Sequence, residues 1–171
     1  MSTGTNLEIE RKYLIRYPDA ALLTRQPGTE VWQIVQTYLT DGPGFQTRRV
    51  RKIVSDGRTR YFRTFKSHVS ALASLEDEAE ISANEYERYI NEADCMRQPI
   101  LKTRYRIPHA GHILEVDIYP FWKDRAVLEI ELGAEDEDAD IPDYLNIIRD
   151  VTGEREYKNS QLARYIPMEE I

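Results

Sequence analysis

Hydrophobic and polar residues alternate with a period of two along much of the chain, which is the pattern of β-strands. Turn sequences such as Asp41-Gly42-Pro43-Gly44 and Asp56-Gly57 separate several of the alternating segments. Because the connections are short, the pattern predicts an antiparallel meander that could close into a barrel. The predicted strands are residues 6–13, 31–39, 45–53, 59–66, 74–82, 100–107, 113–119 and 126–132.

Helical patterns are fewer and shorter. Ser82 or Asn84 could cap a helix that runs to about residue 92. The other predicted helices are residues 18–25, 144–151 and 158–165. A run of acidic residues from Glu135 to Asp140 predicts a solvated loop ahead of the helix at 144–151.

Composition narrows the class of protein. The 171 residues suit a single domain, residues 1–171, and the net charge of −7 disfavours nucleic acid and anionic membranes as partners. The only cysteine, Cys95, excludes an internal disulfide and fits a reducing compartment. Since no apolar run is long enough for a signal peptide or a membrane span, we expect a cytoplasmic protein.

Most of the predicted strands carry charges of a single sign on one face, two or three in a row. A face exposed to water normally mixes both signs with Ser, Thr and Gln, although a sandwich with a charged outer face remains the simplest alternative. The basic rows are Arg49/Arg51, Lys66 and Lys102/Arg104/Arg106, and the acidic rows are Glu8/Glu10, Glu76/Glu78/Glu80, Glu115/Asp117 and Glu129/Glu131.

A sheet that closes with these faces inward would have a lumen rich in both carboxylates and cations. Such a lumen is unfavourable, by roughly several kcal/mol per unpaired ion, unless a ligand compensates the charge. Carboxylate pairs suit Mg²⁺ or Mn²⁺, and rows of Arg and Lys match phosphate oxygens. The two together predict a site for a metal-bound polyphosphate. The chain has no Gly-x-x-x-x-Gly-Lys-Ser/Thr phosphate loop.

The segment Glu8-Ile9-Glu10-Arg11-Lys12 resembles the Glu-x-Glu-x-Lys signature of the CYTH superfamily, the triphosphate tunnel metalloenzymes. Further motifs follow in the family's order and extend the resemblance from about residue 6 to 165. They are Arg49/Arg51, Thr64-Phe65-Lys66, Glu76/Glu78, Lys102-Thr103-Arg104-Tyr105, Glu115/Asp117, Glu129/Glu131 and Tyr157-Lys158-Asn159.

The sequence differs from the family pattern at one position and leaves one motif ambiguous. Ser74 stands where the family often has an arginine. Three glutamates in phase also leave two choices for the acidic pair of this strand, Glu76/Glu78 or Glu78/Glu80. The first choice is preferred because of its distance from Tyr86 in the following helix.

The resemblance implies a mainly β (α+β) fold, a closed eight-stranded antiparallel β-barrel that forms a tunnel, with a few flanking α-helices. It also implies metal-dependent hydrolysis of a small-molecule triphosphate. The segment 36–40 and the motif at 102–105 are most similar to inorganic triphosphatases, which favours inorganic tripolyphosphate as the substrate. The alternatives are a class IV adenylyl cyclase, a thiamine triphosphatase, and a polyphosphate-binding module without catalysis.

Residue roles follow from the same resemblance, for a chain expected to be a monomer or homodimer. A divalent metal, Mg²⁺ or Mn²⁺, would be held by Glu8, Glu10, Glu129 and Glu131. A second site, or the orientation of the attacking water, would fall to Glu76, Glu78, Glu115 and Asp117. The triphosphate would be bound by Lys12, Arg49, Arg51, Lys66, Lys102, Arg104 and Lys158.

Overall fold

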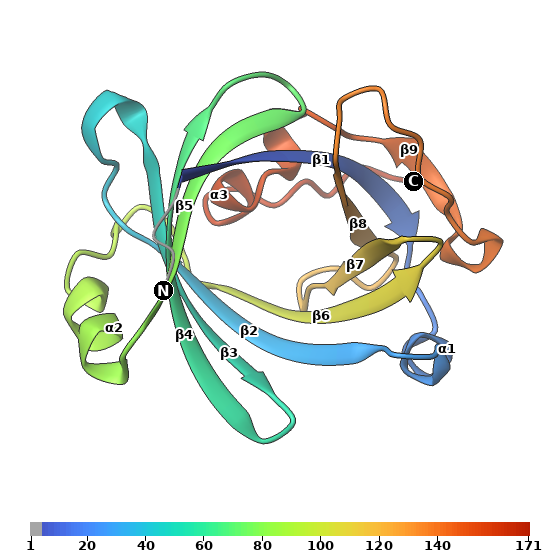
Figure 1. The fold of residues 1–171 in the computed structure, drawn as a ribbon, viewed down its shortest axis with the longest axis horizontal. Coiled ribbons are helices and arrows are strands. Elements are labelled where there is room, and N and C mark those ends of the chain that lie inside the picture. The colour runs from blue at the N-terminus through green and yellow to red at the C-terminus, as the bar shows by residue number, and fades with distance from the viewer. Residues whose placement is uncertain (1–4) are drawn as a thin grey trace.

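A computed structural model describes residues 5–171, which form a ring of strands with short helices around it (Figure 1). The strands are β1 (Thr5–Arg16), β2 (Glu30–Tyr38), β3 (Thr47–Ser55), β4 (Arg58–His68), β5 (Ala73–Ile81), β6 (Ile100–His109), β7 (His112–Ile118), β8 (Arg125–Leu132) and β9 (Ile147–Asp150). The helices are α1 (Ala20–Arg25), α2 (Ala83–Ile90) and α3 (Asn159–Leu162), with 3₁₀ turns η1 (Pro43–Phe45), η2 (Asp143–Leu145) and η3 (Arg155–Tyr157).

The first eight strands close into an antiparallel barrel, which confirms the predicted fold class. Their order is β5-β4-β3-β2-β6-β7-β8-β1, and β1 also pairs with β5. Strand β1 achieves this closure because its residues 5–9 pair with β5 and its residues 9–16 pair with β8. Beyond the point where β5 ends, β9 pairs with residues 13–15 of β1.

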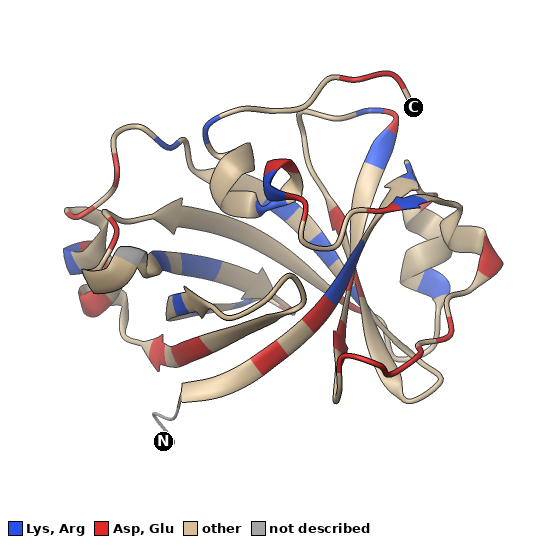
Figure 2. Ribbon diagram, turned by 90° about the horizontal axis from the view of Figure 1, so that it is seen from above, with Lys and Arg blue, Asp and Glu red and all other residues tan. Residues whose placement is uncertain are grey.

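Cross-strand register sets which faces point into the barrel. Residues directly opposite each other on paired strands lie on the same face of the sheet. Lys12 lies opposite Glu129, and Glu10 lies opposite Glu131. Arg106 in turn lies opposite Glu115. The charged rows of neighbouring strands therefore share one face, and acidic and basic bands follow each other along the strands in Figure 2.

Apolar side chains on the opposite face form the outer part of the core. Ile15, Ile107, Leu114 and Leu128 are buried there. Helix α1 contributes Leu23, and η2 and the segment before it cover the same face. The burial of this face holds the strands in the register that turns their charged face inward.

A second apolar cluster closes one end of the barrel. Tyr119, Trp122 and Tyr157 are almost fully buried in it, together with Leu14 and Leu162. The Tyr119 hydroxyl donates a hydrogen bond to Asn159 Oδ1 at 2.7 Å, and Trp122 Nε1 donates one to the carbonyl of residue 167 at 2.9 Å. Helix α3 and the segment after it therefore form a plug at this end.

The prediction of a helix at residues 144–151 is wrong. The spacing of Leu145 and Ile148 fits a helix, but Asn146 has a left-handed backbone with φ of 40° that ends the η2 turn. Residues 147–150 then become β9, because the edge of β1 beyond β5 offers unpaired backbone groups. The acidic run at 135–140 is mostly exposed, as expected, but it precedes η2 rather than a helix.

The other helical predictions agree with the structure apart from their ends. Ser82 caps α2 through a hydrogen bond from the Glu85 backbone N–H, and the Glu85 side chain accepts a hydrogen bond from the Ser82 N–H. α2 ends at residue 90, and α3 covers only the first half of the predicted 158–165. Within residues 5–171, no helix has the length and apolar character needed to cross a membrane.

Candidate functional site

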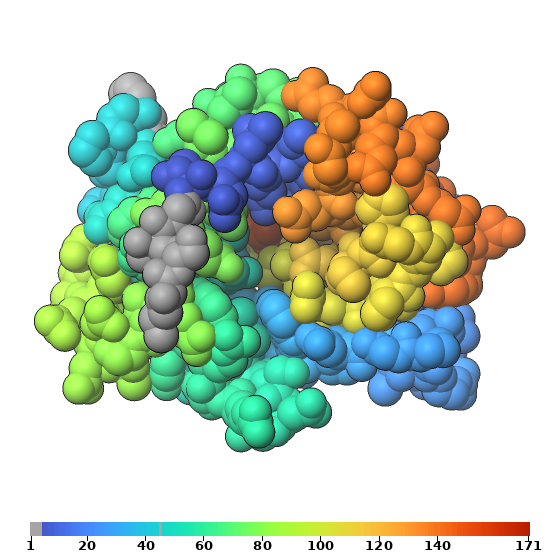
Figure 3. All heavy atoms as spheres, viewed as in Figure 1, coloured from blue at the N-terminus to red at the C-terminus, as the bar shows by residue number. Residues whose placement is uncertain are grey.

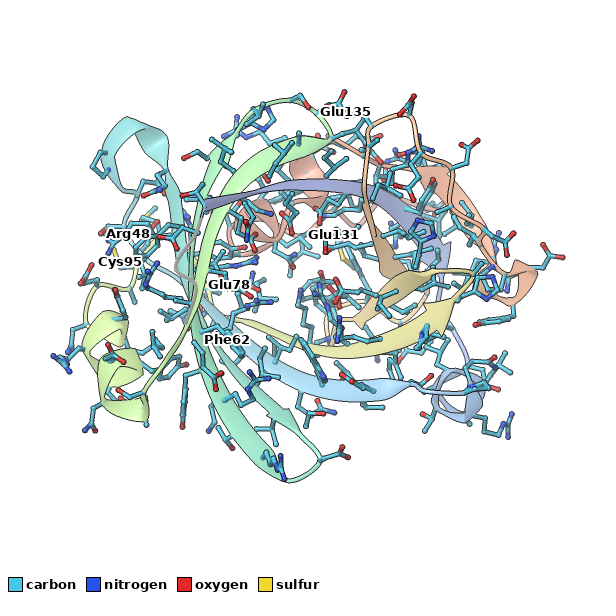
Figure 4. All side chains as sticks on the ribbon, viewed as in Figure 1. Arg48, Phe62, Glu78, Cys95, Glu131 and Glu135 are labelled. Carbon is cyan, nitrogen blue, oxygen red and sulfur yellow. The ribbon has the colours of Figure 1, made fainter. Side chains whose placement is uncertain are left out.

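A cavity of about 750 Å³ occupies the barrel interior above the plug. It opens as a hollow between β1 and the β6–β7 pair in the view of Figure 3. Figure 4 shows Glu78 and Glu131, from β5 and β8, within the space that the strands enclose. The basic residues that line this cavity are Lys12, Arg49, Arg51, Lys66, Arg104, Arg106 and Lys158.

All of the predicted site residues line this cavity except Lys102 and Asp117. The carboxylates in the wall are Glu8, Glu10, Glu76, Glu78, Glu115, Glu129 and Glu131, with Glu137 and Glu154 contributed by loops. The structure therefore brings together both of the charge types that the strands displayed in sequence.

Lys102 and Asp117 lie deeper, next to the plug. Asp117 is fully buried, and its carboxylate accepts hydrogen bonds from Lys102 Nζ at 2.7 Å and from Arg104 Nε and Nη2 at 2.7 and 2.8 Å. Burial raises the pKa of Asp117, but Arg104 and Lys102 outweigh burial and the net pKa is lowered. Burial and the neighbouring Arg104 lower the pKa of Lys102 to about 8. Asp117 therefore holds Arg104 in place, and Lys102 binds Asp117, although neither Asp117 nor Lys102 lines the cavity.

Two lysines lie between pairs of carboxylates. Lys66 Nζ, from β4, forms an ion pair with Glu8 and lies 3.4 Å from Glu76 Oε2. Lys12 Nζ lies 3.3 Å from Glu129 Oε1 and 4.0 Å from Glu10 Oε1. Lys66 thus neutralises carboxylates on β1 and β5, and Lys12 neutralises carboxylates on β8 and on its own strand, β1.

The pKa shifts of the carboxylates depend on how well each one is paired. Burial, with the nearby Glu129 adding to it, raises the pKa of Glu10 to about 7. Burial also raises the pKa of Glu129, but Lys12 and Arg104 bring it well below its ordinary value. Glu131 has a raised pKa because of burial and the neighbouring Glu8. Burial and the neighbouring Glu8 also raise the pKa of Glu76, so Glu10, Glu76 and Glu131 are the acids of this wall whose pKa is raised.

A divalent cation fits the chemistry of this wall. Carboxylate oxygens are the ligands that Mg²⁺ and Mn²⁺ prefer, and the raised pKa of Glu10 marks negative charge that a cation would relieve. Within residues 5–171, no three His, Cys, Asp or Glu side chains converge on one point. The ammonium groups of Lys12 and Lys66 instead occupy the positions between the carboxylates.

Arg49 and Lys158 differ from the other cations of the cavity. Neither forms a salt bridge with any residue in the range 5–171, and the Nε atoms of Arg49 and Arg51 are buried without a hydrogen-bond partner there. Arg51 does bind Glu78, whose Oε2 lies 2.6 Å from Arg51 Nη2 and 2.7 Å from Thr64 Oγ1. Buried donors without partners are the kind of group that an anionic ligand satisfies.

The choice between the two acidic pairs of β5 can be compared with the geometry. Glu76 and Glu78 both line the cavity. Glu80 lies in a smaller adjoining pocket, where its carboxylate binds the exposed Arg60 at 2.8 Å. The preferred pair is thus the one that faces the charged cavity.

Other residues of the wall were not predicted as site residues. Trp32 and Arg106 line one side, where the guanidinium carbon lies 4.5 Å from the centre of the indole ring. The loop after β9, with Thr152 and Glu154, also contributes to the wall. Trp32 could be found from its in-phase position on β2 opposite Arg104. The loop carried no signal because β9 itself was predicted as a helix.

Comparisons with known proteins agree with this architecture. No family model matches the sequence, and no curated protein sequence matches it closely enough to count as a relative. Among solved structures, the inorganic triphosphatase NE1496 is 27% identical to this chain, with a TM-score of 0.55 over 94% of this chain and 96% of the other.

Two further structures are more distant in sequence. The PH1819 protein from Pyrococcus horikoshii OT3 is 18% identical, with a TM-score of 0.57 over 75% of this chain and 80% of the other. A proposed adenylate cyclase from Bacillus halodurans, bh2851, is 16% identical, with a TM-score of 0.51 over 77% of this chain and 83% of the other. At these identities the two likenesses show the fold alone.

The fold and the charged lumen together define the class of protein. The chain has a CYTH-type tunnel fold, as its ordered motifs predicted. Among the structures with this fold, NE1496 is similar to the chain over nearly the full length of both proteins.

Proposed function

We propose that the protein is a metal-dependent triphosphatase that hydrolyses inorganic tripolyphosphate and releases phosphate by the attack of water. The observation that carries this proposal is that two cations, Arg49 and Lys158, form no salt bridge within residues 5–171 and line a cavity that also holds pairs of carboxylates. The similarity to NE1496, which is described as an inorganic triphosphatase, supports the same reaction.

The basic residues of the cavity would bind the phosphates. Phosphoryl transfer depends mainly on positioning and on neutralising charge, so it requires no nucleophilic side chain. Arg49 and Lys158 have no carboxylate partner within residues 5–171, so they are free to bind an anion. Arg104 binds Asp117 and Glu129 and presents a fixed positive charge at the same wall. A phosphate chain here would meet cations from β3, β6 and the segment before α3.

The carboxylates would serve two purposes. Glu8, Glu10, Glu129 and Glu131 would hold Mg²⁺ or Mn²⁺, which supplies positive charge to the phosphate oxygens when bound. Glu76, Glu78 and Glu115 also line the cavity. They would orient the attacking water or hold a second cation. Asp117 would act by holding Arg104, since it does not reach the cavity.

The first experiment measures phosphate release from tripolyphosphate, ATP and thiamine triphosphate, with and without Mg²⁺ or Mn²⁺. The proposal predicts metal-dependent release from tripolyphosphate, with little from the other two. Arg49→Ala should lower the rate about a hundredfold, the effect typical of losing one group that stabilises a charged transition state. Arg58→Ala, at the exposed first residue of β4, is the matched control and should leave the rate unchanged.

The same assay separates the alternatives. Conversion of ATP to cyclic AMP would replace the proposal with a cyclase. A binding module would bind tripolyphosphate but release no phosphate from any substrate. Glu8→Gln distinguishes that case as well, because an enzyme loses turnover while a simple binder keeps its affinity.

A further inference from the structure

Lys12 and Lys66 lie where positive charge is needed by the carboxylates of the candidate metal site. Lys66 Nζ joins Glu8 on β1 to Glu76 on β5, with 3.4 Å to Glu76 Oε2. Lys12 Nζ lies 3.3 Å from Glu129 on β8. Lys12 Nζ also lies 4.0 Å from Glu10. Three of the four carboxylates proposed to hold the cation are therefore already in contact with ammonium groups.

The other cations of the cavity are arranged differently. Arg104 is held by three carboxylates at 2.7 to 3.2 Å, which fixes its position. Arg49 and Lys158 have no ion-pair partner anywhere in residues 5–171. An incoming anion would therefore meet free positive charge first at Arg49 and Lys158.

Lysine is suited to exchange one partner for another. Its ammonium group is a compact charge on a flexible four-carbon stem, whereas arginine binds in a fixed fork. Lys66 lies on the same strand as Thr64, whose neighbour across the sheet is Arg49. A phosphate bound by Arg49 would thus arrive close to the ammonium group that now neutralises Glu8.

From this arrangement we infer that Lys66 and Lys12 are internal counter-ions, which block the carboxylates from a divalent cation until an anion draws the lysines away. This inference rests on the proposed function and deepens it. The anion and the cation bind cooperatively. An anion that binds the lysines frees the carboxylates for the cation, and a cation that binds the carboxylates frees the lysines for the anion. By reciprocity, the factor by which the anion tightens cation binding equals the factor by which the cation tightens anion binding.

The test measures Mn²⁺ binding to the whole protein without any triphosphate, by electron paramagnetic resonance of free Mn²⁺. Lys66→Gln should bind Mn²⁺ about tenfold more tightly than the wild type, a factor typical of coupling between sites. Lys66→Arg keeps the charge and should bind Mn²⁺ as weakly as the wild type. Lys123→Gln, at an exposed loop position, is the control for loss of a positive charge far from the cavity.

A second measurement uses the wild type alone, so it does not depend on the folding of a variant. Sulfate is a tetrahedral anion that binds free Mn²⁺ only weakly. Adding it should tighten Mn²⁺ binding to the wild type, and should have a smaller effect on Lys66→Gln. Equal Mn²⁺ affinity for wild type and Lys66→Gln, or no effect of sulfate on the wild type, would overturn the inference.

These readouts are independent of turnover. If tripolyphosphate is hydrolysed but the Mn²⁺ affinities of wild type and Lys66→Gln are equal, the counter-ion role is wrong and the proposed function stands. If the affinities differ as expected but no triphosphate is hydrolysed, the proposed function fails and the counter-ion role stands.

Discussion

The interior of the barrel has two regions, a charged cavity and an apolar plug, built from the same strands. On three of the strands the inward-facing residues change from charged to apolar in the same direction along the barrel. The series are Glu8, Glu10, Lys12 and Leu14 on β1, Glu131, Glu129 and Val127 on β8, and Glu115, Asp117 and Tyr119 at β7 and the residue after it. The plug supplies apolar burial, so the cavity can retain charges that contribute little to stability.

Trp122→Ala should have the largest effect on stability, because Trp122 fills the centre of the plug. Its side chain is 2% exposed and packs against Tyr119 and Tyr157. Removing it should lower the free energy of unfolding by about 3–5 kcal/mol. Urea denaturation measures this loss, and the affinity of the folded fraction for tripolyphosphate should be unchanged. A variant that keeps its stability but loses the affinity would mean that the two regions are not separable.

Asp117→Asn tests the boundary between the two regions. The substitution leaves Lys102 buried without its negative partner and removes one of the three carboxylates that hold Arg104. It should cost about 3 kcal/mol, the low end for a broken buried ion pair. The free energy of unfolding from urea titrations at neutral pH measures the loss.

The same residue predicts a dependence on pH. The folded state lowers the pKa of Asp117 because Arg104 and Lys102 outweigh burial, so the unfolded chain binds the proton more readily. The stabilisation is therefore full well above 3.8, the ordinary pKa, and is lost as the pH falls from there toward the lower pKa of the folded state. Asp117→Asn should lose less stability over this acidic range than the wild type, and equal losses would contradict the prediction.

Lys158→Gln should have the smallest of these effects and should act on binding alone. The residue has no salt bridge within residues 5–171 and lines the cavity beside the plug. Removing one charged contact to a phosphate should weaken tripolyphosphate binding about tenfold, or ~1.4 kcal/mol. Isothermal titration measures the binding, and urea denaturation should show unchanged stability. A loss of stability would contradict the prediction and would mean that Lys158 stabilises the plug.

Sequence periodicity predicted the strands and the direction of their charged faces, because side chains on a strand alternate strictly. Periodicity could not predict how deep in the barrel interior each inward-facing side chain lies. Asp117 and Glu115 have the same phase on β7, yet Glu115 lines the cavity and Asp117 is enclosed behind Arg104. Depth depends on the tilt and stagger of the strands in the closed barrel, and alternation within one strand contains no information about either.

The error at β9 has a different cause. Leu145 and Ile148 have helical spacing, but the edge of β1 beyond β5 needs a pairing partner, and that need appears only once the barrel has closed. The loop that follows β9 enters the cavity wall for the same reason. Tertiary pairing, rather than the local helical preference of the sequence, thus determined the secondary structure of residues 147–150.

The double pairing of β1 also bears on how the chain folds. Its residues 5–9 pair with β5, and its residues 9–16 pair with β8, which follows β2 to β7 in the chain. Contacts between segments so distant in sequence are slow to form, since the entropy of closing a long loop opposes them. During synthesis, β1 is made first and β8 is made much later, so the apolar face of β1 stays exposed until β8 is available to pair with it. Closure of the barrel is therefore expected to be a late step in folding, and the charges of the cavity come together only then.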